Sequence, residues 1–254
     1  MNQLHSKIIG QGEPMIILHG LFGMLDNWQR YGKIWSDRFE VHLVDQRNHG
    51  RSFHSERFDY AAMAHDLLLY MDQHQIPRAT ILGHSMGGKT AMLHACVNPD
   101  RINRLIIVDI APKYYPPHHQ EILKALHSVE VKKLEGRADA DKVMAEHLPQ
   151  FGVRQFLLKN LYWKTDKQLD WRFNLKEISE NIENVGTALN NGLRFKGPTL
   201  FIRGEKSDYV LPQDYGLIHT HFPNAEIRTV EKAGHWVHAE NPQEFEATVN
   251  GFLA

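Results

Sequence analysis

The chain of 254 residues has a single cysteine, Cys96, and no long apolar run. One cysteine cannot form a disulfide within the chain, which is typical of proteins from a reducing compartment. The longest apolar runs, such as residues 15–18 and 105–108, are far shorter than the roughly 18 residues of a membrane helix. The first seven residues contain no apolar stretch of the kind that a secretory signal requires. We therefore expect a cytoplasmic protein without a membrane partner.

An excess of charge of either sign is also lacking, because 29 Lys and Arg residues face 30 Asp and Glu residues. Nucleic-acid binding requires clustered positive charge, so we expect no nucleic-acid partner. The 17 histidines include the pairs His118/His119 and His235/His238, but no HExxH or CxxC spacing accompanies them. We therefore expect no bound metal. The hydrophobic fraction of 42% excludes intrinsic disorder, since such a chain can bury enough surface to fold.

Short apolar runs alternate along the chain with helical patterns. The apolar runs predict strands at residues 8–9, 15–18, 41–45, 79–83, 105–108, 199–202 and 226–230. Apolar residues spaced by three and four predict helices, among them residues 60–74, 87–97 and 242–252. Strands of continuous apolar character are typical of a parallel sheet that is buried on both faces. The sequence therefore predicts an α/β fold with helices on both faces of the sheet.

One stretch, residues 112–195, interrupts this alternation with helical patterns alone. These cover residues 120–129, 138–148, 153–161 and 175–189. The stretch is too long for a loop. We therefore predict a core domain of residues 1–111 and 196–254 and a helical cap of residues 112–195. Ligands of open α/β sheets bind at the carboxyl ends of the strands, so this cap should roof the site.

Residues 83–87 read Gly-His-Ser-Met-Gly and lie between a predicted strand and a predicted helix. The G-x-S-x-G pattern in that setting is typical of a nucleophile elbow, a turn so tight that the residues flanking the serine must be small. Ser85 is thus the candidate nucleophile. A serine hydroxyl needs a base, and His235 follows the last predicted strand, where it can reach Ser85. We expect the nearby His238 to have a structural role.

The loop that begins at His19 follows a predicted strand and can aim a backbone N–H at a substrate on Ser85. The N–H groups of Leu21 and Met86 are the candidate oxyanion hole, each worth roughly 3 kcal/mol in the transition state. His19, His84 and Trp236 adjoin these groups and are candidate substrate-binding residues.

A polar loop and a set of aromatic residues in the insertion each allow two interpretations. Arg47, His49 and Arg51 could line the pocket, but we favour a solvated loop. The inserted aromatic residues either wall an acyl site or form the core of the insertion, and these are Trp163, Trp171 and Phe173.

Five segments together resemble the α/β-hydrolase superfamily and, more narrowly, the bacterial YbfF-type carboxylesterases. They are residues 19–23, 45–52, 83–89, 108–112 and 234–240. The resemblance implies an α/β-hydrolase fold with an eight-stranded, mostly parallel sheet and a helical cap. It also implies a Ser-His-acid triad and ester hydrolysis without a cofactor.

Two aspartates compete for the third position of that triad. Asp208 lies in the loop where most α/β-hydrolases place the acid, whereas Asp109 lies where the YbfF-type enzymes are thought to draw theirs. Asp109 directly follows an apolar run, so the sheet should hold its backbone rigidly, while Asp208 lies in a more solvated loop. We therefore favour Asp109, with Asp208 as the alternative.

These features predict a serine carboxylesterase that hydrolyses short- to medium-chain esters or thioesters through an acyl-enzyme. Halide and epoxide hydrolases of this fold use an aspartate nucleophile, and Ser85 argues against them. Thioesterase, perhydrolase and C–C hydrolase chemistry remain open, as does a non-catalytic ligand receptor of the same fold. The expected partner is a small-molecule ester. The sequence leaves the physiological substrate and the oligomeric state open.

Overall fold

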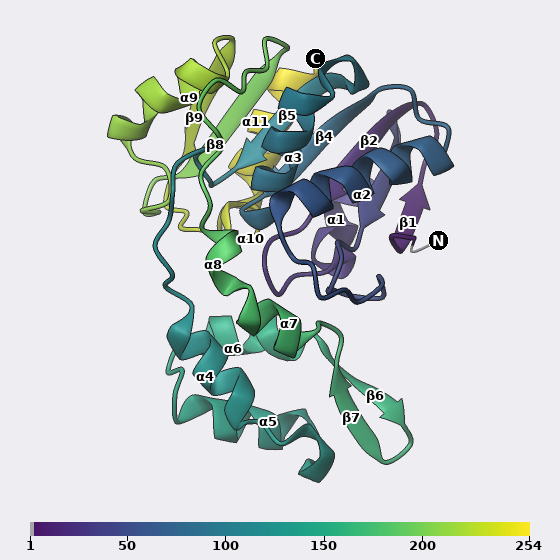
Figure 1. The fold of residues 1–254 in the computed structure, drawn as a ribbon, viewed down its shortest axis with the longest axis vertical. Helices are drawn as coiled ribbons and strands as arrows, with labels where there is room; N and C mark the ends of the chain where they lie inside the picture. The colour runs from purple at the N-terminus through teal and green to yellow at the C-terminus, as the bar shows by residue number, and fades with distance from the viewer. Residues whose placement is uncertain (1–2) are drawn as a thin grey trace.

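The computed structural model describes residues 3–254, so residues 1 and 2 of the opening segment and of the predicted core domain lie outside the described residues. Its main sheet has seven strands in the order β1-β3-β2-β4-β5-β8-β9 (Figure 1). Their bounds are β1 Ser6–Ile9, β2 Glu13–Leu18, β3 Phe39–Val44, β4 Ala79–His84, β5 Ile102–Val108, β8 Thr199–Gly204 and β9 Ala225–Val230. Only β1 runs antiparallel to its neighbour, so the predicted mostly parallel sheet is confirmed.

The family resemblance implied eight strands in the main sheet, and this prediction is wrong for the described residues, which form seven. The seven strands correspond to the seven apolar runs of the sequence. The segments that join them form helices, turns or an inserted hairpin, and within residues 3–254 no further segment pairs with the edge strands β1 and β9. No part of the described chain is left to form an eighth strand.

Helices cover both faces of the sheet because alternate strand residues point to opposite sides. Ile16 packs in one cluster with Met71 and Met92, whereas Ile17 packs in another with Trp28 and Phe245. The first face carries α2 (Tyr60–Gln73), α3 (Met86–Val97) and α9 (Tyr215–His221), and the second carries α1 (Gln29–Trp35) and α11 (Pro242–Leu253). The short helices of the core are η1 (Leu25–Trp28), η2 (Pro99–Arg101), η4 (Pro212–Asp214) and α10 (Val237–Glu240). No helix in residues 3–254 is long and apolar enough to span a membrane.

Residues 112–195, here called the inserted lobe, leave the core after β5 and return before β8 (Figure 1). The lobe contains α4 (Gln120–Ser128), η3 (Val131–Lys133), α5 (Arg137–Ala145), α6 (Phe151–Leu158), β6 (Leu161–Thr165), β7 (Gln168–Trp171), α7 (Leu175–Glu180) and α8 (Ile182–Val185). The hairpin β6–β7 was not expected from the sequence. Most of β6 is exposed, so it lacks the apolar run by which buried strands are recognised.

The aromatic residues of the lobe divide between core and surface. Trp171 and Phe173 are buried and stack on each other with ring centroids 5.2 Å apart, whereas Trp163 is 52% exposed. The first two therefore belong to the core of the lobe.

Both connections of the lobe are tied to α3. The Lys89 ammonium donates hydrogen bonds of 2.5 Å to the carbonyls of Lys113 and Thr187, which lie in the outgoing and returning connections. Burial lowers the pKa of Lys89 to about 7. The two connections also pair with each other, since the N–H of Tyr115 donates to the carbonyl of Gly186. These bonds fix the lobe beside the carboxyl ends of β4 and β5.

Candidate active site

Ser85 lies in a strained turn between β4 and α3, with φ 52° and ψ −116°. A non-glycine residue with positive φ is uncommon, and such strain gathers at functional sites. A Cβ atom at Gly83 would lie 2.3 Å from the Gly87 carbonyl oxygen, and one at Gly87 would lie 2.5 Å from that of Leu18. Only glycine fits at these two positions. The turn therefore presents Ser85 at the carboxyl edge of the sheet, as the motif predicts.

Asp109 lies in an equivalent position after β5 and also has positive φ, at 51°. Its side chain is fully buried. Oδ1 accepts a hydrogen bond of 2.9 Å from the Gly204 N–H, and Oδ2 accepts bonds from the Ser207 hydroxyl and from Nδ1–H of His235, the latter at 2.8 Å. Three donors thus fix the carboxylate. The bond to Asp109 selects the tautomer of His235 that carries its proton on Nδ1. Nε2 is then the ring nitrogen without a proton.

Asp208, the alternative acid, is exposed to solvent. Among the described residues no hydrogen bond joins it to His235, and its neighbour Ser207 instead contacts Asp109. The structure therefore brings Asp109, and not Asp208, to His235.

His235 is held from two sides. Its ring stacks on Tyr209, with centroids 3.9 Å apart and planes inclined by 17°. Its carbonyl accepts a hydrogen bond of 2.9 Å from Nε2–H of His84. Burial keeps the pKa of His84 well below the ordinary histidine value, so His84 is a neutral donor. Ser85 and His235 line the same cleft, which has a volume of about 790 Å³.

The loop after β2 forms a tight turn, closed by a bond of 2.9 Å from the Gly23 N–H to the Gly20 carbonyl. Phe22 has a φ of 57°, and its N–H donates to Nε2 of His49 at 3.1 Å. The N–H of Leu21 takes part in neither bond. The turn therefore does not use this group in its own hydrogen bonds.

The approach of this loop to the serine is close. A Cβ atom at Gly20 would lie 3.3 Å from Cβ of Ser85 and 2.9 Å from Nδ1 of His84. Leu21, Ser85 and Met86 line one small pocket. The two residues predicted to supply the oxyanion donors therefore lie at the same pocket as the serine.

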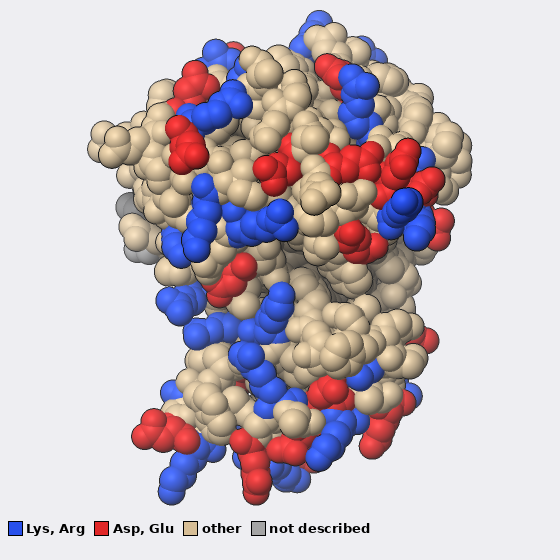
Figure 2. All heavy atoms as spheres, turned by 180° about the vertical axis from the view of Figure 1, so that it is seen from behind, with Lys and Arg blue, Asp and Glu red and all other residues tan. Residues whose placement is uncertain are grey.

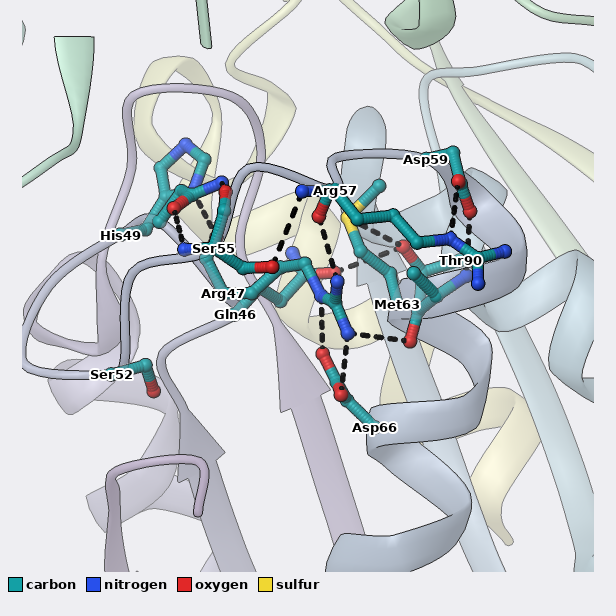
Figure 3. A network of polar contacts seen from close by, with 12 residues as sticks. Gln46, Arg47, His49, Ser52, Ser55, Arg57, Asp59, Met63, Asp66 and Thr90 are labelled. Carbon is teal, nitrogen blue, oxygen red and sulfur yellow. Dashed lines mark hydrogen bonds and ion pairs between the residues drawn. The ribbon is translucent and has the colours of Figure 1, made fainter. Parts of the chain in front are cut away.

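The polar loop after β3 forms a network of hydrogen bonds (Figure 3) and contacts the loop after β2 through His49. Nδ1–H of the buried His49 donates to the Arg47 carbonyl at 2.9 Å, and burial lowers the pKa of His49 to about 3. His49 thus stays neutral and accepts the Phe22 N–H. Arg47 forms a buried ion pair with Asp66 of α2, with Nε 2.6 Å from Oδ2.

The expectation of a solvated loop is therefore wrong for Arg47 and His49, and only Arg51 is exposed. Asp66 neutralises Arg47 from a helix 19 residues away, a pairing that the sequence does not reveal.

The three candidate substrate-binding residues all line the 790 Å³ cleft, but they differ in exposure. His19 is 1% exposed and both its ring nitrogens contact the protein, because Nδ1–H donates to the Gly20 carbonyl and Nε2 accepts the Gln46 N–H. His84 is likewise buried beneath His235. Trp236 is half-buried and packs on Phe156 of the inserted lobe, with centroids 5.6 Å apart. Trp236 is thus the most accessible of the three.

Several positioning residues were missed by the sequence analysis. Ser207 and Tyr209 lie on either side of Asp208, in the loop that the sequence analysis considered for the acid. Ser207 contacts Asp109 and Tyr209 stacks on His235, but neither side chain was considered. Asn160, from the inserted lobe, donates a bond of 2.8 Å from Nδ2 to the Phe22 carbonyl. No motif marks such a contact, since its partners lie 138 residues apart.

His238, for which we expected a structural role, is buried at the wall of the larger cleft. Its ring stacks on Trp28 with centroids 4.2 Å apart, and its Nδ1 has no hydrogen-bond partner among the described residues. Burial lowers its pKa to about 3. Across residues 3–254 no three His, Cys, Asp or Glu side chains are grouped to hold a metal ion.

The depressed pKa of His238 makes stability depend on pH. The folded state keeps this ring neutral, whereas the unfolded chain takes up a proton below about pH 6.5, so stability is lost as pH falls from there. The free energy of unfolding of wild type falls between about pH 7 and about pH 5. We expect this fall to be about 2 kcal/mol smaller in His238→Phe, which has no ring nitrogen to protonate. Urea unfolding at both pH values measures this. The exposed His65→Phe is the control, and an equal pH dependence in the two variants would contradict the assignment.

Comparison with known proteins places this geometry in a family. A family model described as the alpha/beta hydrolase fold matches residues 13–242. The chain is 39% identical over 248 residues to the sn-1-specific diacylglycerol lipase ABHD11 of Mus musculus, covering 94% of this chain and 80% of the mouse protein. It is 36% identical over 241 residues to esterase YbfF of Escherichia coli, covering 94% and 92%. A solved marine microorganism esterase has a TM-score of 0.96 at 37% identity, covering 99% and 100%. The chain therefore belongs to the alpha/beta hydrolase fold family, among the esterases and lipases that act on ester bonds.

Proposed function

We propose that the protein is a serine carboxylesterase with Ser85 as nucleophile, His235 as base and Asp109 as the acid that orients His235. The observation that carries the proposal is the bond of 2.8 Å between Nδ1 of His235 and Oδ2 of Asp109, beside a cleft that Ser85 also lines. We further propose that it acts in the cytoplasm, in keeping with its one free cysteine.

The reaction follows from the roles of these groups. Oγ of Ser85 attacks the ester carbonyl carbon while Nε2 of His235 takes the hydroxyl proton. The N–H groups of Leu21 and Met86 hold the negative oxygen of the tetrahedral intermediate. His235 then gives the proton to the leaving alcohol, and an acyl-enzyme remains. Water repeats the sequence, releases the carboxylic acid and restores Ser85. Asp109 holds the tautomer and stabilises the positive ring.

Two hollows meet at Ser85, and the chemistry assigns a substrate part to each. The larger, of about 790 Å³, is lined by His235, whereas the smaller, of about 20 Å³, is lined by Met86 but not by His235. The leaving oxygen must lie beside His235 to receive its proton. The alcohol part therefore belongs in the larger cleft and the acyl part in the smaller pocket. A space of about 20 Å³ holds little more than one water-sized group, which favours short acyl chains.

The inserted lobe, residues 112–195, acts in this proposal as a cap that sets acyl length. Ile182 and Val185 of the lobe line the small pocket, opposite Ile110 of the core. The cap thus closes the acyl end of the site.

We expect Ile182→Ala to raise kcat/KM for butanoyl and hexanoyl esters relative to acetyl esters by about tenfold, since one methylene group in an apolar pocket is worth about 1–3 kcal/mol. An acyl-length series of activated esters with a common alcohol measures this. Ile122→Ala is the matched control, because Ile122 lines only the larger cleft and should leave the ratio unchanged. An equal shift in both variants would place the acyl chain elsewhere.

A lipase that acts on diacylglycerols is the second candidate. The mouse relative bears that name, and the larger cleft has room for a long chain. In that case the acyl chain lies in the larger cleft, and long-chain diacylglycerol emulsions are cleaved faster than soluble short-chain esters. The same acyl-length series, extended by a long-chain diacylglycerol emulsion and run on wild type with Ser85→Ala as the blank, decides between the two.

A further inference from the structure

A second large hollow, separate from Ser85, opens between the core and the inserted lobe. Its volume is about 520 Å³, within the range of small-molecule sites. The core contributes residues near β1, η1 and the loop after β3, and the lobe contributes residues from α5 to β7. Folding of the chain thus joins four distant segments into one concave surface.

The charged side chains that line this hollow are mostly cationic, and they are Lys7, Arg51, Arg137, Lys159 and Arg172, against Asp26 and Asp45. Asp45 is buried and its two carboxylate oxygens accept the backbone N–H groups of Leu25 and Arg51. The chain as a whole has a net charge of −1, so this concentration of positive charge is local. In Figure 2 Lys and Arg side chains gather on one side of the waist between the two lobes.

None of these five cations forms an ion pair within residues 3–254, whereas some exposed basic residues elsewhere do. Exposed examples of such pairs are Arg57 with Asp59, and Lys133 with Glu130. Lys164 of β6, close in sequence to the hollow, pairs with Asp170. The positive charges that line the hollow are thus not neutralised by a paired carboxylate.

Three of the cations are oriented by contacts that leave their charge unneutralised. The Arg172 guanidinium lies over the Tyr162 ring, 3.8 Å from its centroid. Arg137 donates to the Leu161 carbonyl at 3.0 Å, and Lys7 donates to Oε1 of Gln29 at 3.3 Å. Holding like charges near one another costs free energy, which an anion between them would recover.

We propose that this hollow binds a phosphate group. Arg guanidinium groups match the geometry of phosphate oxygens, and Lys ammonium groups add point charges. The size of the hollow fits a small phosphorylated molecule. The ligand is either part of the substrate or a free anion.

Lys159 connects the hollow to the catalytic cleft, because it lines both. If the alcohol part of the substrate occupies the larger cleft, a phosphate at its far end reaches the hollow past Lys159. This extension rests on the proposed function, whereas the binding of a free anion does not.

Binding of inorganic pyrophosphate, followed by calorimetry at low ionic strength, tests the site directly. We expect Arg51→Gln/Arg172→Gln to weaken binding about tenfold. Arg51→Lys/Arg172→Lys keeps the charge and should retain most of the affinity. The exposed pair Lys33→Gln/Lys132→Gln, which lines neither hollow, should bind as wild type does. Absence of binding to wild type, or equal weakening in the last pair, would overturn the proposal.

A second arm identifies the source of the phosphate. Acetyl esters of a series of alkanols are compared with the same esters carrying a terminal phosphate. A preference for the phosphorylated esters that falls about tenfold in Arg51→Gln/Arg172→Gln assigns the hollow to the substrate. Pyrophosphate binding without such a preference assigns it to a free anion. Absence of pyrophosphate binding to wild type, with turnover of neutral esters intact, would reject the phosphate site alone. Absence of all ester turnover in wild type would reject the proposed function.

Discussion

Replacing Ser85 by alanine should lower kcat for an activated ester by about six orders of magnitude, by analogy with serine proteases. The variant keeps the cleft, the oxyanion donors and the Asp109–His235 pair, but it has no oxygen to form the acyl-enzyme. Single-turnover and steady-state assays of the same ester measure the loss.

The control for this experiment is Ser36→Ala, which alters the serine directly after α1. Ser36 lines neither of the two hollows at Ser85, so kcat should be unchanged. Undiminished turnover by Ser85→Ala would contradict the mechanism. If wild type shows no turnover, and Ser85→Ala binds ligands as tightly as wild type does, the protein is a receptor with a hydrolase fold.

Replacing Asp109 by asparagine should lower kcat by about 10⁴-fold, again by analogy with serine proteases. An asparagine amide at this position donates to Nδ1 and so favours the tautomer whose Nε2 carries the proton and cannot accept one from Ser85. The Gly204 N–H and the Ser207 hydroxyl fix the side chain in place, which prevents it from turning away freely.

Asp208→Asn is the matched control, one residue from Ser207 and exposed. It should leave kcat near the wild-type value. A large loss for Asp208→Asn with a small loss for Asp109→Asn would reverse the assignment of the acid. Intermediate losses in both would mean that the two carboxylates share His235.

The sequence predicted the sheet and the elbow because their signals are local. Each strand is an apolar run, and Gly83 and Gly87 flank Ser85 within five residues. The number of strands was wrong only where the family's count of eight replaced the seven runs of this chain. Local patterns were therefore the better guide to this sheet.

The acid could be favoured but not decided from the sequence, because its geometry depends on contacts across the fold. The positive φ of Asp109 and the Ser207 hydroxyl at its carboxylate come from strands β5 and β8 lying side by side. The same holds for Arg47, whose burial depends on Asp66 of α2. The exposed hairpin β6–β7 escaped notice because it has no buried face.

Covalent labelling identifies the nucleophile of the enzyme. The protein is incubated with an activated organophosphate, digested and analysed by peptide mass spectrometry. We expect one adduct, on Ser85, which is absent in Ser85→Ala and forms much more slowly in His235→Ala, where Ser85 has lost its base. An adduct on a different residue, or continued ester turnover with Ser85 unlabelled, would contradict this expectation.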